Sequence, residues 1–353
     1  MRIAVLNTQI PFVRGGAEVL ADTLVRELNE RGHESCLVTI PFKWYPAKSI
    51  GKHVNSCWNI DLSEADGKKI DRVIALKFPV YCISHPHKII WLCHQHRQAY
   101  DLWENPDRGL GTTWSKEKND GEAIRSFIRF ADEEAFLGAK KIYAISSNVA
   151  NRLKKFNDRE CQVLYPPTPF LKGTEKAEAF DDFLLYPSRI TRLKRQDLVV
   201  EAFCRTKSET KLYLAGAVND TEYFEKIRKI VRKSNAEERV KFLGEVDENQ
   251  LRDLYSRTRA VVFTPFDEDY GLITVEAFAH SKAVLTTTDS GGPTEFVKDG
   301  ENGYVVKPEP DLLAEGIRKL SDEKKARALG VNAGKAWRDA DINWSNVVAE
   351  FTK

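Results

Sequence analysis

The sequence predicts an α/β protein with two Rossmann-like, doubly wound domains that face a central cleft, and three observations support this fold class. Short apolar strand patterns alternate with amphipathic helical patterns along most of the chain, which is typical of parallel sheets covered by helices. The length of 353 residues suits two domains. The stretch YPPTPFLKGT, at 165–174, interrupts the alternation with three prolines and indicates a linker.

This linker divides the chain into an N-terminal domain at 1–167 and a C-terminal domain at 168–333. We expect the last segment, 334–353, to be helical and to pack back on the N-terminal domain. Because doubly wound sheets bind ligands at the carboxyl ends of their strands, the expected site is the cleft between the two domains.

The N-terminal domain begins with RIAVLNTQ, a strand of the buried type, and the glycine loop VRGGAE follows it. Gly15 and Gly16 in this loop either let the backbone approach a ligand closely or form a plain turn. Apolar residues then recur at helical spacing from Val19 to Leu28. The further predicted strands of this domain are SCLVTI, DRVIAL, KIIWLC and KIYAIS.

The C-terminal domain repeats the alternation of strands and helices. FLLYPS leads into the helical pattern DLVVEAF, and AVVFTP leads into a helix that begins near Leu272. The remaining predicted strands are KLYLAG, RVKFLG and AVLTTT. Both halves therefore show the strand–helix–strand unit of a parallel sheet.

Composition excludes several classes of protein. The net charge is only +2, from 54 basic and 52 acidic residues, which argues against a nucleic-acid partner. The six cysteines show no zinc-type or C-x-x-C spacing, so we expect reduced thiols in a cytoplasmic protein. The chain starts directly with a strand pattern, so we expect no signal peptide, and no apolar run approaches the ~20 residues of a membrane span.

The stretch TPFDEDYGLITVEAFAH, at 264–280, contains the first group of candidate site residues. After Gly271, the N–H groups of residues 271–273 begin a helix and favour an anion such as phosphate. Glu268 in the loop and Glu276 in the helix can accept hydrogen bonds from hydroxyl groups. A phosphate held between two hydroxyl-bearing rings describes a nucleotide sugar. The alternative is a solvated acidic turn with Glu276 exposed on an ordinary helix.

The stretch YPSRITRLKRQDLVVEAF, at 186–203, also joins a strand to a helix. The planar guanidinium of Arg189 can bind a phosphate through two hydrogen bonds, and the Lys194 ammonium can bind it as a compact charge. Both side chains can therefore converge on one diphosphate. We expect Arg192 and Arg195 to face solvent. The alternative is that the whole loop is an ordinary basic surface.

Together these stretches resemble family 4 of the retaining, nucleotide-sugar-dependent glycosyltransferases, which have the B-type fold of two Rossmann-like domains. Arg189 and Lys194 match the family's Arg and Lys, and Glu268 and Glu276 match its two glutamates with seven residues between them. YGLITVEAFAHSKAVLTTTDSGGPTEFVKDGENGYVV resembles the family's most typical block, and RVKFLGEVDENQLRDLY resembles its nucleobase-side strand. In the N-terminal half, GGAE and WLCHQHRQAYDLW resemble the family's glycine loop and its strand ending in His.

Four positions depart from the family pattern. Ser188 replaces the usual Gly before the Arg, Tyr270 replaces Phe, and His280–Ser281 replace a small residue and Gly. These differences affect the fine geometry of donor binding and leave the class unchanged.

The resemblance implies a role for each matching residue. Arg189 and Lys194 would hold the donor diphosphate and stabilise the charge that leaves with it. Glu276 would bind ribose hydroxyls, and Glu268 would bind sugar hydroxyls. The implied catalytic residues are His94, Arg189, Lys194 and Glu268. The implied donor-binding residues are Gly16, Ser188, Arg189, Lys194, Val246, Glu268, Tyr270, Gly271, Leu272, Ile273 and Glu276. The implied acceptor-side residues are Gly15, Gly16, His96 and Arg97.

The expected reaction is hexosyl transfer with retention, from UDP-glucose or a related UDP-hexose to a hydroxyl of a glycan or lipid-linked saccharide, in polysaccharide or glycoconjugate synthesis. We expect no cofactor and no metal, because Arg189 and Lys194 can neutralise the diphosphate; the D-x-D pattern at 267–269 is the competing metal motif. The segment 41–58 carries aromatic and basic residues that suit contact with an acceptor, peripheral contact with the cytoplasmic face of a membrane, or a solvated loop.

Three other functions compete with this one. A nucleotide-sugar epimerase on the same fold would convert the donor without an acceptor. A non-catalytic nucleotide-sugar-binding protein would not need Arg189, Lys194 and both glutamates. An NAD-dependent dehydrogenase is disfavoured, because no G-x-G-x-x-G follows the first strand.

Overall fold

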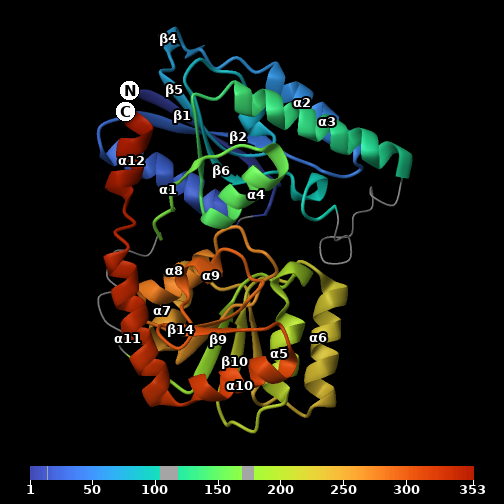
Figure 1. Cartoon of the computed structure of the whole chain (residues 1–353), viewed down its shortest axis with the longest axis vertical. Helices are drawn as coiled ribbons and strands as arrows, with labels where there is room; N and C mark the ends of the chain where they lie inside the picture. The colour runs from blue at the N-terminus through green and yellow to red at the C-terminus, as the bar shows by residue number, and fades with distance from the viewer. Residues whose placement is uncertain (14, 104–117, 169–178) are drawn as a thin grey trace. The chain divides into compact units, whose positions relative to one another are not determined.

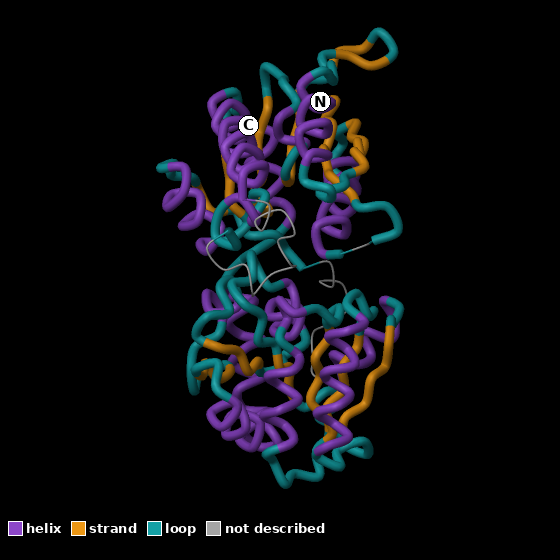
Figure 2. The backbone as a smooth tube through the Cα atoms, turned by 90° about the vertical axis from the view of Figure 1, so that its right-hand side faces the viewer, coloured by secondary structure: helices purple, strands orange, loops and turns teal. Residues whose placement is uncertain are grey.

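The computed structural model describes residues 1–13, 15–103, 118–168 and 179–353. The chain forms two compact units, one of Met1–Pro169 with Asn343–Lys353 and the other of Phe170–Ile342. Each unit is a parallel sheet with helices around it (Figures 1 and 2). The prediction of two Rossmann-like α/β domains is confirmed. Most of the predicted linker at 165–174 lies outside the described residues.

The first unit contains a six-stranded sheet in the order β2-β1-β5-β6-β7-β8, in which every neighbouring pair is parallel. Its strands are β1 (Arg2–Gln9), β2 (Glu34–Pro41), β5 (Arg72–Lys77), β6 (Lys88–His94), β7 (Lys141–Ala144) and β8 (Gln162–Val163). A separate antiparallel hairpin, β3 (Glu64–Ala65) with β4 (Lys68–Lys69), projects from this unit (Figure 2). The central strands are apolar on both faces, which agrees with the full burial of Val5, Ile74 and Leu92.

Helices connect the strands of the first unit. They are α1 (Gly16–Glu30), α2 (Lys48–Trp58), α3 (Lys118–Leu137), α4 (Ser147–Asn157) and α12 (Trp344–Thr352), with short 3₁₀ turns η1 (Val80–Cys82) and η2 (Arg97–Ala99). Helix α1 buries the stripe Leu20, Leu24 and Leu28, which recurs at helical spacing. Helices α2 and α3 contact each other, as do α1 and α12 (Figure 1).

The second unit contains a six-stranded parallel sheet in the order β11-β10-β9-β12-β13-β14. Its strands are β9 (Phe183–Pro187), β10 (Lys211–Ala215), β11 (Val240–Gly244), β12 (Ala260–Val262), β13 (Val284–Thr287) and β14 (Gly303–Val306). Its helical elements are η3 (Arg192–Lys194), α5 (Gln196–Cys204), α6 (Thr221–Lys233), α7 (Glu248–Arg257), α8 (Leu272–Ala279), α9 (Pro293–Phe296), α10 (Pro310–Ser321) and α11 (Glu323–Asp339). In chain order this is the 3-2-1-4-5-6 arrangement of dinucleotide-binding folds, so the strand order reverses between β9 and β12.

The prediction of one helical segment at 334–353 is wrong in its extent. Residue 334 lies inside α11, which ends at Asp339 in the second unit, and α12 then belongs to the first unit. Asn343 separates the two helices, because its side chain accepts a hydrogen bond from the N–H of Asn346 at 2.9 Å and caps α12. Trp344 and Phe351 of α12 contact the buried Trp91 edge-on, with ring centroids 6.2 and 5.1 Å apart.

No helix among the described residues is both long enough and apolar enough to cross a bilayer.

Candidate active site

The candidate site of the second unit lies at the point where its strand order reverses. β9 and β12 are hydrogen-bonded neighbours, and the segments that leave their carboxyl ends contain the basic stretch and the acidic stretch of the sequence. In doubly wound sheets, ligands bind outside the carboxyl ends of the strands at the point where the strand order reverses. The fold therefore brings together two stretches that are about 75 residues apart in the chain.

The two loops meet through an ion pair between Lys194 and Glu268. The Lys194 ammonium lies 2.5 Å from Oε2 of Glu268, and both side chains are only partly exposed, at 19% and 25%. Arg189, in the same basic loop, has an exposed side chain. Gln196 fixes the backbone beside it by donating a hydrogen bond to the Arg189 carbonyl at 2.9 Å. Two adjoining loops thus carry the ammonium of Lys194, the carboxylate of Glu268 and the exposed guanidinium of Arg189.

The backbone of Glu268 is held from both sides. Its N–H donates to the carbonyl of Ser290 at 2.9 Å, and its carbonyl accepts from the N–H of Gly292 at 2.8 Å. The preceding Asp267 donates its N–H to the Asp289 carbonyl at 2.9 Å. The acidic loop is therefore hydrogen-bonded to the loop that follows β13. These bonds fix the backbone of Glu268, from which its carboxylate side chain extends.

Helix α8 starts directly after Gly271, which has a φ of 82°. An added Cβ at this residue would come within 2.7 Å of Cγ of Pro293, so both the conformation and the space require glycine. Leu272 and Ile273 lie in the first turn, where backbone N–H groups have no carbonyl one turn earlier in the helix to receive them. This helix start can therefore donate to an anion.

Glu276 is buried, with 8% of its surface exposed. The alternative that it is an exposed helix residue is therefore wrong. Tyr255 of α7 donates its hydroxyl to Oε2 of Glu276 at 2.7 Å, and the ring of Tyr255 stacks on His280 with centroids 5.1 Å apart. Burial raises the pKa of Glu276 to about 7, and the hydrogen bond from Tyr255 partly offsets this rise. The sequence did not point to Tyr255, because a tyrosine on a helix is usually a core residue.

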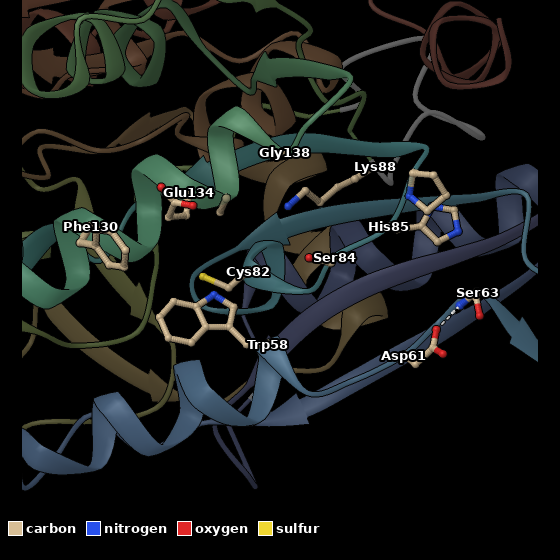
Figure 3. Close-up of a pocket in the computed structure, with 12 residues that line it drawn as sticks. Trp58, Asp61, Ser63, Cys82, Ser84, His85, Lys88, Phe130, Glu134 and Gly138 are labelled. Atoms are coloured by element: carbon tan, nitrogen blue, oxygen red, sulfur yellow. Dashed lines mark hydrogen bonds between the residues drawn. The ribbon is translucent and has the colours of Figure 1, made fainter.

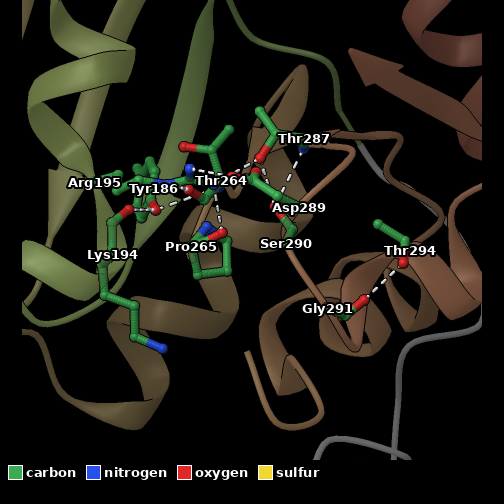
Figure 4. Close-up of polar contacts among 10 residues, drawn as sticks. All are labelled: Tyr186, Lys194, Arg195, Thr264, Pro265, Thr287, Asp289, Ser290, Gly291 and Thr294. Atoms are coloured by element: carbon green, nitrogen blue, oxygen red, sulfur yellow. Dashed lines mark hydrogen bonds and ion pairs between the residues drawn. The ribbon is translucent and has the colours of Figure 1, made fainter. Parts of the chain in front are cut away.

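Arg195 does not face solvent as predicted. Its guanidinium is directed inward, where it donates hydrogen bonds to the last residue of β13 and to the loops that follow β12 and β13 (Figure 4). Arg192 does lie at the surface, where it forms ion pairs with Asp220 and Glu222 at 2.8 Å each.

The other donor-side candidates are placed as follows. Ser188 is buried at the end of β9 and donates its hydroxyl to the Arg189 carbonyl at 3.0 Å. Tyr270 is buried and contacts Phe296 edge-on, with centroids 5.6 Å apart. Val246 is half-buried in the segment between β11 and α7. No observation tests their predicted contacts with a donor, which stay predictions.

The candidates of the first unit lie at the carboxyl ends of its strands. Gly15 caps α1, with its N–H donating to Glu18 at 2.9 Å, and Glu18 also pairs with Lys77 at 2.6 Å. Gly16 is the first residue of that helix. His94 ends β6, half-buried, with its Nδ1 2.7 Å from the Gln95 carbonyl.

The two acceptor-side candidates that follow His94 are engaged within the first unit. The ring of His96 packs against Phe78, with centroids 5.3 Å apart, and burial lowers its pKa to about 4. Arg97 forms an ion pair with Asp101 at 2.6 Å. His96 is therefore neutral near pH 7, and the charge of Arg97 is already paired. Their predicted contact with an acceptor stays a prediction.

A cavity of about 600 Å³ in the first unit lies apart from these candidates (Figure 3). Its lining includes Lys88, at the amino end of β6, whereas His94 is at the carboxyl end of the same strand. The Lys88 ammonium is buried and donates to the Tyr81 carbonyl at 2.8 Å, and burial lowers its pKa to about 8. Among the residues that the structure describes, no cluster of three or more His, Cys, Asp or Glu could hold a metal ion; independence from metal stays a prediction.

Residues 172–337 match the family model for group 1 glycosyl transferases. The chain is 29% identical to the N-acetyl-alpha-D-glucosaminyl L-malate synthase of Bacillus anthracis, over 94% of this chain and 91% of that enzyme. It is 26% identical to the human alpha-1,3/1,6-mannosyltransferase ALG2, over 43% of this chain. The match spans only 40% of the human enzyme and 52% of the enzyme from Rhizomucor pusillus.

Solved structures show the same fold. Anabaena HepE, in complex with UDP and glucose, superposes with a TM-score of 0.70 at 18% identity, over 98% of both chains. WaaG, a glycosyltransferase involved in lipopolysaccharide biosynthesis, superposes with a TM-score of 0.67 at 17% identity, over all of both chains. At these identities the likeness concerns the fold alone.

Proposed function

Because the chain belongs to the group 1 glycosyltransferases through residues 172–337, we propose that it transfers a hexosyl group from a nucleotide sugar to a hydroxyl of a glycan or lipid-linked saccharide, with retention of anomeric configuration. The observation that carries this proposal is the pairing of Lys194 with Glu268 where the strand order of the sheet reverses. A bound diphosphate needs a positive charge at this place, and a bound hexose needs a group that accepts hydrogen bonds from its hydroxyls. Lys194 supplies the positive charge, and the Glu268 carboxylate can accept the hydrogen bonds.

The diphosphate is the leaving group of the proposed reaction. The bond between the hexose anomeric carbon and the diphosphate oxygen breaks, and its electron pair goes to that oxygen. Lys194, the exposed fork of Arg189 and the N–H groups that begin α8 stabilise the charge as it develops. These groups accelerate the reaction only as far as they bind the departing diphosphate more strongly than the intact donor.

The acceptor hydroxyl forms the new bond to the same face of the anomeric carbon. Its proton passes to the departing diphosphate, so the products are the glycoside and a nucleoside diphosphate. Glu268 holds hydroxyls of the hexose during the transfer. Glu276, held by Tyr255, accepts hydrogen bonds from the ribose.

UDP-glucose or a related UDP-hexose is the donor we propose, and the UDP and glucose bound to the structurally similar HepE support this choice. Lys194 and Arg189 would neutralise the diphosphate without a metal or another cofactor. The segment 41–58 exposes Tyr45 and Trp58, and such aromatic residues are enriched at membrane–water interfaces. This supports peripheral contact of a cytoplasmic enzyme with the membrane that would present a lipid-linked acceptor.

A panel of UDP-, GDP- and ADP-sugars tests the proposal. We expect one donor to raise the melting temperature and to release its nucleoside diphosphate slowly in the absence of an acceptor. Lys194→Ala should lose the release, whereas Arg192→Ala, in the same loop, should retain it. If no donor is bound or cleaved, the proposal is wrong. If a donor is recovered as its epimer, the epimerase alternative is correct.

A further inference from the structure

Arg195 adopts a backbone conformation that is unusual for a residue with a side chain. Its φ and ψ are 52° and 41°, in the left-handed region, where it forms the N-cap of α5. Glycine adopts this conformation without steric cost, whereas other residues are uncommon there. We therefore expect the side chain of Arg195 to make interactions that offset the cost of this backbone conformation.

The guanidinium of Arg195 makes five hydrogen bonds (Figure 4). Four go to the loops that follow β12 and β13, and one goes to Thr287, the last residue of β13. On the β12 side, it donates to the carbonyls of Thr264 at 2.8 Å and Pro265 at 2.7 Å. On the β13 side, it donates to the hydroxyl of Thr287 at 2.8 Å and to both carboxylate oxygens of Asp289 at 2.8 Å each. One planar group thus ties two loops together.

These two loops are the ones that determine the position of Glu268. Arg195 holds the acidic loop where it leaves β12, at Thr264 and Pro265. It also holds Asp289, whose carbonyl accepts the N–H of Asp267 next to Glu268. The residue before Arg195 is Lys194, whose ammonium meets the Glu268 carboxylate. Arg195 therefore fixes both ends of the arrangement that brings Glu268 to Lys194.

We propose that Arg195 is a positioning residue for sugar transfer: it fixes the loop 264–269 against the loop 287–292, so that Glu268 meets the hexosyl group of the donor in a set geometry. The inference rests on the proposed function. Arg195 itself does not bind the donor, since its hydrogen bonds go to protein groups. Its loss should therefore affect the hexosyl group much more than the nucleotide.

Two substitutions separate the side chain from the backbone conformation. Arg195→Gly removes the guanidinium but suits the left-handed backbone. Arg195→Lys retains the charge but loses the planar fork that reaches two loops at once. Arg192→Lys is the matched control, because it makes the same change three residues earlier, at a surface ion pair.

Hydrogen exchange tests the positioning without any donor. In Arg195→Gly and Arg195→Lys, the N–H groups of Asp267 and Glu268 should exchange faster than in the wild type, while those of β9 and β10 should not change. The control should match the wild type throughout. Unchanged exchange at Asp267 and Glu268 would overturn the proposal, whatever reaction the protein catalyses.

Kinetics then test the consequence for transfer, with UDP and UDP-glucose as probes. Misplacement of a catalytic group by about 1 Å costs on the order of 100-fold in rate, so kcat should fall by about that factor while the affinity for UDP is retained. Equal losses of affinity for UDP and UDP-glucose, with a lower melting temperature, would show that Arg195 only stabilises the fold. If the wild type cleaves no nucleotide sugar, the proposed function fails, and hydrogen exchange still decides whether Arg195 orders the loop.

Discussion

The buried carboxyl group of Glu276 should destabilise the protein when it ionises, and Glu276→Gln should remove this cost. The ordinary pKa of the side chain is 4.5, and burial raises it to about 7. The folded state therefore holds a proton that the unfolded state has lost between these two pH values, so stability falls as pH rises through this window. Each pH unit between the two pKa values corresponds to about 1.4 kcal/mol, so ionisation above pH 7 costs up to about 3 kcal/mol.

Glutamine has nearly the same shape as glutamate, and its carbonyl oxygen can still accept the hydrogen bond from Tyr255. At pH 8, Glu276→Gln should therefore raise the free energy of unfolding by up to about 3 kcal/mol. At pH 4.5 the wild-type carboxyl group is protonated in the folded state, so the substitution should change little. The same substitution should weaken the binding of UDP about tenfold, because a neutral acceptor replaces a charged one.

Urea denaturation of both proteins at pH 4.5 and pH 8 measures the effect on stability, and calorimetric titration with UDP measures the effect on binding. Glu238→Gln is the matched control, since the side chain of Glu238 is 98% exposed. If the stability difference between wild type and Glu276→Gln is the same at both pH values, the reasoning about ionisation is refuted. An unchanged affinity for UDP would show that Glu276 does not bind the ribose.

Three further predictions follow from the same site. Lys194→Ala and Arg189→Lys should each lower kcat about 100-fold. The melting temperature should change little, because the charge of Arg189 is exposed and the ion pair of Lys194 is partly exposed to solvent. A near-wild-type kcat in both variants would mean that the basic loop is an ordinary surface. Tyr255→Phe removes the hydrogen bond that favours the Glu276 carboxylate, so the pH at which UDP binding is half-maximal should rise; an unshifted titration would contradict this. Turnover should be unchanged when EDTA removes divalent metal ions. If EDTA abolishes turnover and Mn²⁺ restores it, the D-x-D pattern at 267–269 is a metal site instead.

The sheets could be predicted from the sequence because their signals are local. Runs such as RIAVLNTQ and FLLYPS are short, apolar and bounded by loops, and they form the inner strands β1 and β9. The proximity of the basic and acidic loops also followed, because parallel strands place their carboxyl ends at one edge of a sheet. The break at Asn343 could have been predicted, because asparagine is a strong helix N-cap residue.

The partners of buried polar groups could not be predicted. Arg195 lies in a run of basic residues that suggests a solvated loop, yet its acceptors are 69 to 94 residues further along the chain. Tyr255 and Glu276 are 21 residues apart, on different helices. Such contacts depend on how β12, β13 and the helices around them assemble, and no local spacing encodes them.

Proton NMR of the purified enzyme with its donor tests the central claim most directly, because one time course follows both the donor and the product. With UDP-glucose, we predict that UDP appears and that the first sugar product has the α configuration of the donor, with Lys194→Ala inactive. A product that first appears as the β anomer would contradict retention. An unchanged donor, or one that turns into its epimer without release of UDP, would contradict glycosyl transfer itself.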